Sequence, residues 1–139
     1  MAIEFHQENV EIKDLDEQKS AAWLEDAILT EGFESGDINL IFCNDEYLLN
    51  MNQQYLKHDY YTDIITFDYT ENKLVSGDLF ISIDRVNDNA KTLSVDPSLE
   101  LSRVMVHGIL HLCGFKDKNP EEKDIMTERE NFYLLRLQQ

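Results

Sequence analysis

Residues 96–117, DPSLELSRVMVHGILHLCGFKD, decide the fold because they predict one long helix that is apolar on nearly every side. Asp96 and Pro97 are typical of a helix start, with the proline near the first helical position. The helix is expected to run to about Cys113, and Gly114 follows at the position where a helix-ending glycine is common. A helix without a polar face is buried. The rest of the chain must therefore surround this segment.

The flanking sequence predicts four strands and four further helices. Strands are indicated by β-branched and aromatic runs, and helices by apolar residues at helical spacing. The expected strands lie within 2–12 and at 38–43, 64–69 and 79–83; the expected helices lie at 14–29, 45–55, 84–93, 96–113 and 121–137.

Turn and cap residues separate these segments. Asn44 is the expected N-cap of the helix at 45–55. Gly36-Asp37 and Gly77-Asp78 are expected to be turns before strands, and the polar segment 70–76 predicts a hairpin-like link. Strands dominate the first half of the chain and helices the second. We therefore expect a single α+β domain over 1–139, a small mixed β-sheet with helices packed on it.

The composition is that of a globular protein with a strong negative charge. The chain has 139 residues, 42% of them apolar, and 12 Lys plus Arg against 28 Asp plus Glu give a net charge of −16. Such a chain is not a general polyanion binder, so a nucleic-acid substrate would need a locally positive cleft or a metal ion.

Cysteine usage and hydropathy predict the compartment. Cys43 and Cys113 both lie in apolar runs, which predicts buried thiols in a reducing compartment. No apolar run approaches 18 residues, and the N-terminus lacks the features of a secretory signal. We expect a cytoplasmic protein without a membrane segment.

Two histidines and an aspartate in the central segment have the spacing of a metal site. His107 and His111 are four residues apart, so they share one face of the helix, and Asp117 follows six residues later, beyond Gly114. Two imidazoles and a carboxylate suit zinc and other first-row metals, and three protein ligands leave an open position for water. The alternative is that both histidines are satisfied core residues of a buried helix.

The same spacing occurs in zincin-type metallopeptidases, which makes peptide hydrolysis a second candidate function. In that class the position after the first histidine holds a general-base Glu, and the third ligand is a His. Here these positions hold Gly108 and Asp117. The missing base argues against peptidase chemistry.

The segment 107–117 also resembles the signature of the YbeY family of bacterial rRNA maturation endoribonucleases, H-G-x-L-H-L-x-G-[YF]-D-H. The matching residues are His107, Gly108, Leu110, His111, Leu112, Gly114 and Phe115. A second family pattern, L-N-x-x-Y-R-x-x-D-x-x-T-[DN]-V-L-S-F, is echoed more loosely at 51–67. Asp117 stands where the family has its third His, and Leu56 where it has an Arg.

This resemblance implies an α+β fold with a zincin-like metal site on a helix. It implies His107, His111 and Asp117 as ligands of about one zinc ion per chain. It further implies a metal-dependent, single-strand-specific endoribonuclease that acts in 16S rRNA 3′-end maturation and ribosome quality control, with rRNA and the small ribosomal subunit as partners. A third possibility is a non-catalytic ribosome-assembly factor with a structural metal site.

Positive charges near this site are the candidates for RNA contact. They are Lys57, His58, Arg85, Arg103 and Lys116. We expect Lys57 and Arg103 to contribute to catalysis or RNA binding, and Arg103 lies one helical turn before His107. For each of these residues a solvated surface charge is the alternative. Asp63 is expected to be a turn or cap residue, with a role at the site as the alternative.

Overall fold

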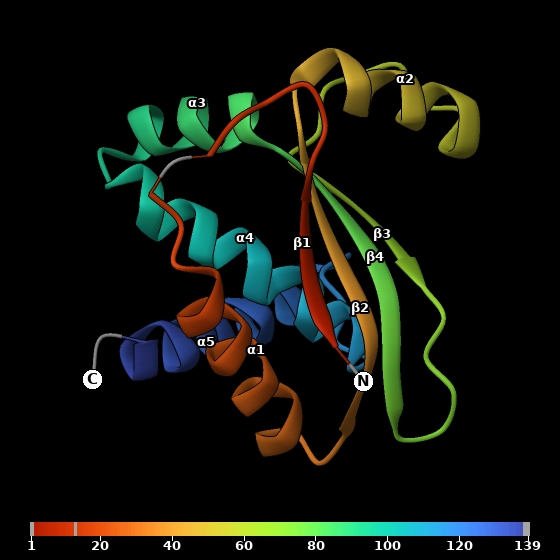
Figure 1. Ribbon diagram of the computed structural model, residues 1–139, viewed down its shortest axis with the longest axis vertical. Coiled ribbons are helices and arrows are strands. Elements are labelled where there is room, and N and C mark those ends of the chain that lie inside the picture. The colour runs from red at the N-terminus through yellow and green to blue at the C-terminus, as the bar shows by residue number, and fades with distance from the viewer. Residues whose placement is uncertain (1, 13, 138–139) are drawn as a thin grey trace.

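The computed structural model describes residues 2–12 and 14–137 (Figure 1). Its elements follow the predicted order along the chain. They are β1 (Ile3–Gln7), α1 (Glu17–Thr30), β2 (Glu34–Cys43), α2 (Asp45–Leu56), β3 (Ile64–Asp68), β4 (Leu74–Ser82), α3 (Ile83–Leu93), α4 (Pro97–Leu112) and α5 (Pro120–Leu137).

The strands form one mixed four-stranded sheet in the order β1-β2-β4-β3. β1 and β4 both run parallel to β2, and β3 pairs with β4 in the antiparallel direction. The two parallel pairs are joined by crossovers that contain helices, as parallel pairing requires. The α+β class with a small mixed sheet is confirmed.

Helices cover mainly one face of this sheet. α1, α4 and α5 lie together on one face, and α2 lies at the far end of the sheet (Figure 1). The main core lies between the sheet and α4, where Met105, Ile109 and Leu110 are fully buried. A smaller apolar cluster beneath α2 contains Leu48 and Ile65. Within the central segment 96–117, α4 is therefore the largely buried helix that the apolar sequence predicts.

α4 begins and ends at the residues that the sequence indicates as its start and stop. Asp96 is the N-cap, and its side chain accepts a hydrogen bond from the Ser98 backbone N–H at 2.8 Å. Beyond the helix, Gly114 has a φ of 100°, which favours glycine. The backbone N–H of Phe115 then donates to the Leu110 carbonyl at 3.0 Å. This C-terminal motif turns the chain back toward the helix.

Two expected turns are wrong. β2 begins at Glu34 rather than at residue 38, and β4 begins at Leu74 rather than at 79, so both glycine-aspartate pairs lie inside strands. The register of β2 against β4 shifts between Ser35 and Ile38, so Gly36-Asp37 lie in a β-bulge. Pairing with neighbouring strands outweighs the local turn preference.

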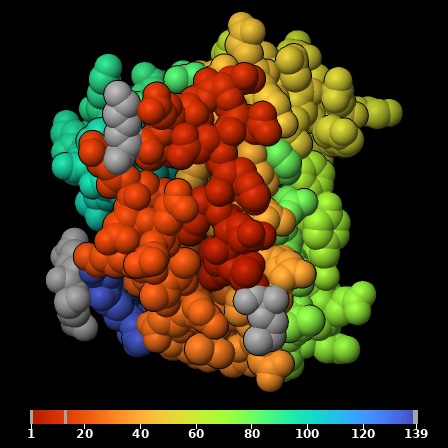
Figure 2. Space-filling model, in the orientation of Figure 1, coloured from red at the N-terminus to blue at the C-terminus, as the bar shows by residue number. Residues whose placement is uncertain are grey.

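The segment of β1 and the residues after it cover the middle of one face of the molecule, and α2 lies at the upper right (Figure 2).

Two further expectations concern the thiols and a membrane segment. Cys43 and Cys113 are both buried and free, as expected, and burial raises the pKa of each thiol to about 12. Among the described helices, none has the length and apolar character that a membrane span requires.

Candidate metal centre

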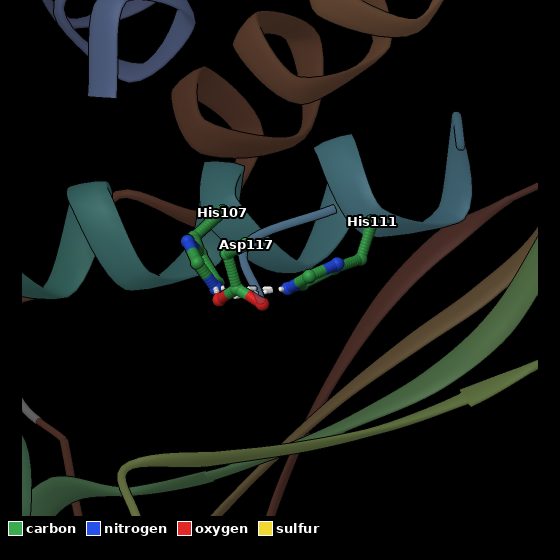
Figure 3. A group of neighbouring side chains, drawn as sticks. All are labelled: His107, His111 and Asp117. Atoms are coloured by element: carbon green, nitrogen blue, oxygen red, sulfur yellow. Dashed lines mark hydrogen bonds and ion pairs between the residues drawn. The ribbon is translucent and has the colours of Figure 1, made fainter. Parts of the chain in front are cut away.

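Three side chains predicted as metal ligands meet at the C-terminal end of α4 (Figure 3). His107 and His111 project from one face of the helix, and the chain that turns at Gly114 brings Asp117 back beside them. Asp117 Oδ2 lies 3.3 Å from His107 Nε2 and 3.4 Å from His111 Nε2. The two Nε2 atoms are 3.0 Å apart. One ligand atom from each residue lies within 4.8 Å of the others.

Each imidazole is oriented by a hydrogen bond from its other nitrogen. His107 Nδ1 donates to Glu130 Oε2 at 2.6 Å, and His111 Nδ1 donates to the Phe115 carbonyl at 2.9 Å. A backbone carbonyl and an ion-paired carboxylate act as acceptors, so both hydrogens are assigned to Nδ1. In the neutral rings both Nε2 atoms therefore present lone pairs to the cluster, as metal-binding histidines do.

This arrangement fits a cation. Two Nε2 lone pairs and a carboxylate oxygen converge within 3.4 Å of one another, and such donors repel unless a positive charge lies between them. A proton on one imidazole or a divalent metal ion would supply that charge. Two His and one carboxylate form a donor set that zinc and several other first-row metals accept.

Glu130 links the cluster to Arg103. This carboxylate is only 8% exposed; it accepts from His107 through one oxygen and from Arg103 Nη1 at 2.8 Å through the other. Burial lowers the pKa of His107, but the hydrogen bond and charge of Glu130 and the charge of Asp117 raise it more, so its pKa lies above the ordinary value. Glu130 therefore favours positive charge at His107.

A cavity of about 260 Å³ opens beside His107 and Asp117. Its other lining residues are Asp63, Glu100, Arg103, Val104 and Glu130. Burial is the main cause that raises the pKa of both Asp63 and Glu100. The cavity thus combines carboxylates with a single lining guanidinium, Arg103.

The two expected catalytic cations lie in different places. Arg103 lines the cavity, and its guanidinium is held by Glu130 and by Asn131 Oδ1 at 2.8 Å. Lys57 is the C-cap of α2, with a left-handed φ of 57°, and does not line this cavity. The structure thus brings Arg103, but not Lys57, to the predicted ligands.

Sequence reasoning missed Glu100 and Glu130, although a signal for each was present. Glu100 shares a face of α4 with Val104, His107 and His111, at intervals of four, three and four residues. Glu130 lies on the buried face of α5 between Met126 and Tyr133. A carboxylate on the apolar face of a helix needs a partner, and that requirement could have marked both residues. Asp63, expected to be a turn or cap, lines the cavity.

Gly108 is where a zincin-type peptidase would carry its general base, and its surroundings disfavour that role. A Cβ atom at this position would lie 2.8 Å from Ile64 Cδ1 and 2.9 Å from Leu79 Cδ1. A side chain here would point into the sheet and away from the cavity. The geometry therefore argues against peptidase chemistry at this site.

The fold and the side-chain cluster define a small α+β protein with a His-x-x-x-His candidate metal site on its central helix. The chain belongs to the YbeY endoribonuclease family, because a family model described as "Endoribonuclease YbeY" matches residues 2–138. The resemblance noted at 107–117 is thereby confirmed.

Similar proteins cover most of the chain. A Parabacteroides distasonis protein named Endoribonuclease YbeY is 51% identical over 131 residues, covering 94% of this chain and 92% of that relative. A Flavobacterium johnsoniae protein with the same name is 50% identical over 115 residues, covering 83% of each. A solution structure of a Thermotoga maritima protein, 28% identical, has a TM-score of 0.67 and covers 97% of this chain and 88% of its own. The first two relatives are thus named as hydrolases that cut RNA internally.

Proposed function

We propose that this protein is a metal-dependent endoribonuclease that cuts single-stranded rRNA in the cytoplasm. Its role would be 16S rRNA 3′-end maturation and ribosome quality control, with the small ribosomal subunit as partner. Family membership supports an endoribonuclease that acts on RNA. The single observation that carries the metal dependence is the convergence of His107 Nε2, His111 Nε2 and Asp117 Oδ2 beside a cavity.

Zinc is the metal we propose, at about one ion per chain. His107, His111 and Asp117 would hold it. The chemistry that a divalent ion supplies in such a site is Lewis acidity toward a phosphoryl oxygen. Its positive charge would also offset part of the net charge of −16 where a phosphate must approach.

The chain's own residues divide the remaining tasks. Glu130 orients His107 and holds Arg103 at the cavity wall. The guanidinium is therefore already oriented, and it would lose little side-chain entropy on binding a phosphate. Asp63 and Glu100, whose pKa values are raised, line the same cavity as candidate proton-transfer groups. Lys57, outside the cavity, would contact the RNA backbone away from the cleaved bond.

Metal content and RNA cleavage, measured on the same preparations, test this proposal. We expect about one zinc ion per wild-type chain and its loss in His107→Ala, His111→Ala and Asp117→Ala. Each variant should also lose cleavage of a labelled single-stranded RNA, and chelation should abolish wild-type cleavage until zinc returns. His6→Ala is the matched control, because His6 is exposed and bonds Asn39 instead.

Either of two outcomes would contradict the proposal. Cleavage that survives both chelation and the ligand substitutions would exclude a metal-dependent reaction here. Stoichiometric zinc without cleavage, together with small-subunit binding that survives His107→Ala, would indicate a non-catalytic assembly factor.

A further inference from the structure

The last turn of α2 and the connection that follows it toward β3 expose three aromatic rings within seven residues. Tyr55, Tyr60 and Tyr61 are 63%, 57% and 52% exposed. We call residues 55–61 the aromatic loop. Exposed tyrosines clustered in one short segment are typical of surfaces that bind a partner, because such rings otherwise remain in unfavourable contact with water.

The aromatic loop is held in place from beneath. The Asn52 side chain, almost fully buried, donates from Nδ2 to the Tyr60 carbonyl at 2.9 Å. The Asn52 carbonyl accepts from the His58 backbone N–H at 3.1 Å, and Gln53 Nε2 donates to Asp59 Oδ1 at 2.6 Å. A loop fixed in this way presents its rings with little ordering cost on binding.

Each ring has a contact with a ring or a cation and retains a large open surface. Tyr60 stacks on His58, with ring centroids 5.1 Å apart and planes inclined by 19°. The Arg85 guanidinium lies 5.4 Å from the centroid of Tyr61. Tyr55 meets Phe67 edge-on at 5.9 Å. Since more than half of each tyrosine remains accessible, flat groups can stack on these rings.

Two positive side chains accompany these rings on a strongly negative protein. Lys57 belongs to the aromatic loop itself, and Arg85 reaches it from α3. Arg85 is also paired with Asp45 and Asp88, whereas Lys57 forms no ion pair within 2–12 and 14–137. Lys57 is therefore available to an external anion.

The aromatic loop leads directly to the candidate metal centre. Asp63 follows Tyr61 by two residues and lines the cavity that contains His107 and Asp117. The Asp63 carbonyl accepts from the Ser82 backbone N–H at 2.9 Å, which anchors this end of the loop to β4. An RNA strand that is bound in the cavity can thus continue onto the aromatic loop.

We propose that the aromatic loop binds unpaired bases of single-stranded RNA by stacking on Tyr60 and Tyr61, with Lys57 at the backbone. This inference rests on the proposed function and adds a base-binding subsite beside its cleavage site. Aromatic rings recognise single strands because every unpaired base offers a flat face, whereas the bases of a duplex are already stacked on one another. Stacking on the aromatic loop would thereby explain how a protein with only 12 Lys plus Arg prefers single-stranded RNA over duplex RNA.

Binding of an uncleavable RNA tests the subsite separately from catalysis. The probe is a fluorescent single-stranded 2′-O-methyl oligoribonucleotide, compared with an abasic oligomer of equal length and charge. We expect Tyr60→Ala/Tyr61→Ala to bind the base-containing probe about tenfold more weakly, with the abasic probe unaffected. Tyr60→Trp/Tyr61→Trp should restore binding. Tyr69→Ala is the matched control, because Tyr69 is 59% exposed and lies beyond the other end of β3.

The outcomes separate this proposal from the proposed function. Equal affinity of the double-alanine variant and the wild type for the base-containing probe would overturn the subsite. Equal binding of both probes by the wild type would overturn it as well. Normal RNA binding by the double-alanine variant, with its cosedimentation with small ribosomal subunits abolished, would assign the loop to a protein partner and also overturn it. Failure of the proposed function would instead appear as a wild type that cleaves no RNA when loaded with zinc.

Discussion

At the scale of single residues, Glu130 is the buried acid that supports the candidate metal centre from behind His107. It gives one oxygen to His107 and the other to Arg103, and it is nearly buried. A carboxylate behind a metal-binding histidine fixes the ring's tautomer and increases its basicity. Through Glu130 the proposed ligand and the proposed phosphate-binding guanidinium are positioned together.

Replacement of Glu130 is therefore expected to weaken metal binding without removing a ligand. Glu130→Gln keeps the shape and one acceptor but removes the charge, so zinc affinity should fall about 10-fold to 100-fold. Competition with a chromophoric chelator measures this change on folded protein. Glu128→Gln on the exposed face of the same helix is the charge-matched control. Equal zinc affinity in both variants would show that Glu130 has no part in the site.

At the scale of elements, α4 joins the site to the sheet. Gly108 has no side chain, so the helix can approach β3 and β4 closely. On its cavity side the helix carries the two histidines, and on its sheet side Gly108 lies against Ile64 of β3 and Leu79 of β4. The same helix ends at Gly114, where the chain turns back to bring Asp117 to the histidines. Ligand geometry and helix packing are therefore coupled.

A methyl group at 108 is expected to destabilise the protein although alanine favours helices. Gly108→Ala would place its Cβ less than 3.0 Å from two apolar side chains, so overpacking should cost about 1–3 kcal/mol of unfolding free energy. Urea denaturation measures this change. Ser102→Ala, a half-buried position of the same helix, is the control and should be about neutral. A Gly108→Ala variant as stable as the wild type would show that the interface has room.

At the scale of the whole molecule, negative charge and helix packing set the conditions for RNA binding. The net charge of −16 repels a polyanion at long range, so positive groups near the bound RNA strand carry the electrostatic attraction.

α5 packs against α1, where the Trp23 indole N–H donates to the Tyr133 carbonyl at 2.7 Å. That packing brings Glu130, and with it Arg103, to the cavity.

Charge reversal at Lys57 is expected to weaken RNA binding, most clearly at low salt. Lys57→Glu replaces an attraction with a repulsion, and the slope of log affinity against log salt concentration should become shallower by about 0.7 for each RNA phosphate that is no longer neutralised. Fluorescence anisotropy across a salt series measures both quantities. Lys91→Glu, the same charge change on α3, is the control. Unchanged affinity of Lys57→Glu throughout the series would remove Lys57 from the RNA-binding surface.

Features that depend on near neighbours along the chain were predictable from the amino-acid sequence. The order of strands and helices, the caps at Asn44 and Asp96, and the i,i+4 pair of histidines all follow from helical and strand periodicity. These features involve residues a few positions apart, so their geometry is set before distant segments meet. The placement of Asp117 beside the histidines belongs here too, because a glycine turn of known shape separates them.

Features that depend on contacts between distant segments were decided by the tertiary structure alone. Glu130 reaches His107 from 23 residues away because α5 packs on α4, and Asp63 reaches the cavity because β3 pairs with β4. The extensions of β2 and β4 through their glycine-aspartate pairs likewise exist because each strand finds a partner. The physical reason is common to all three: the free energy of such contacts comes from burial and pairing between elements, which local residue preferences do not encode.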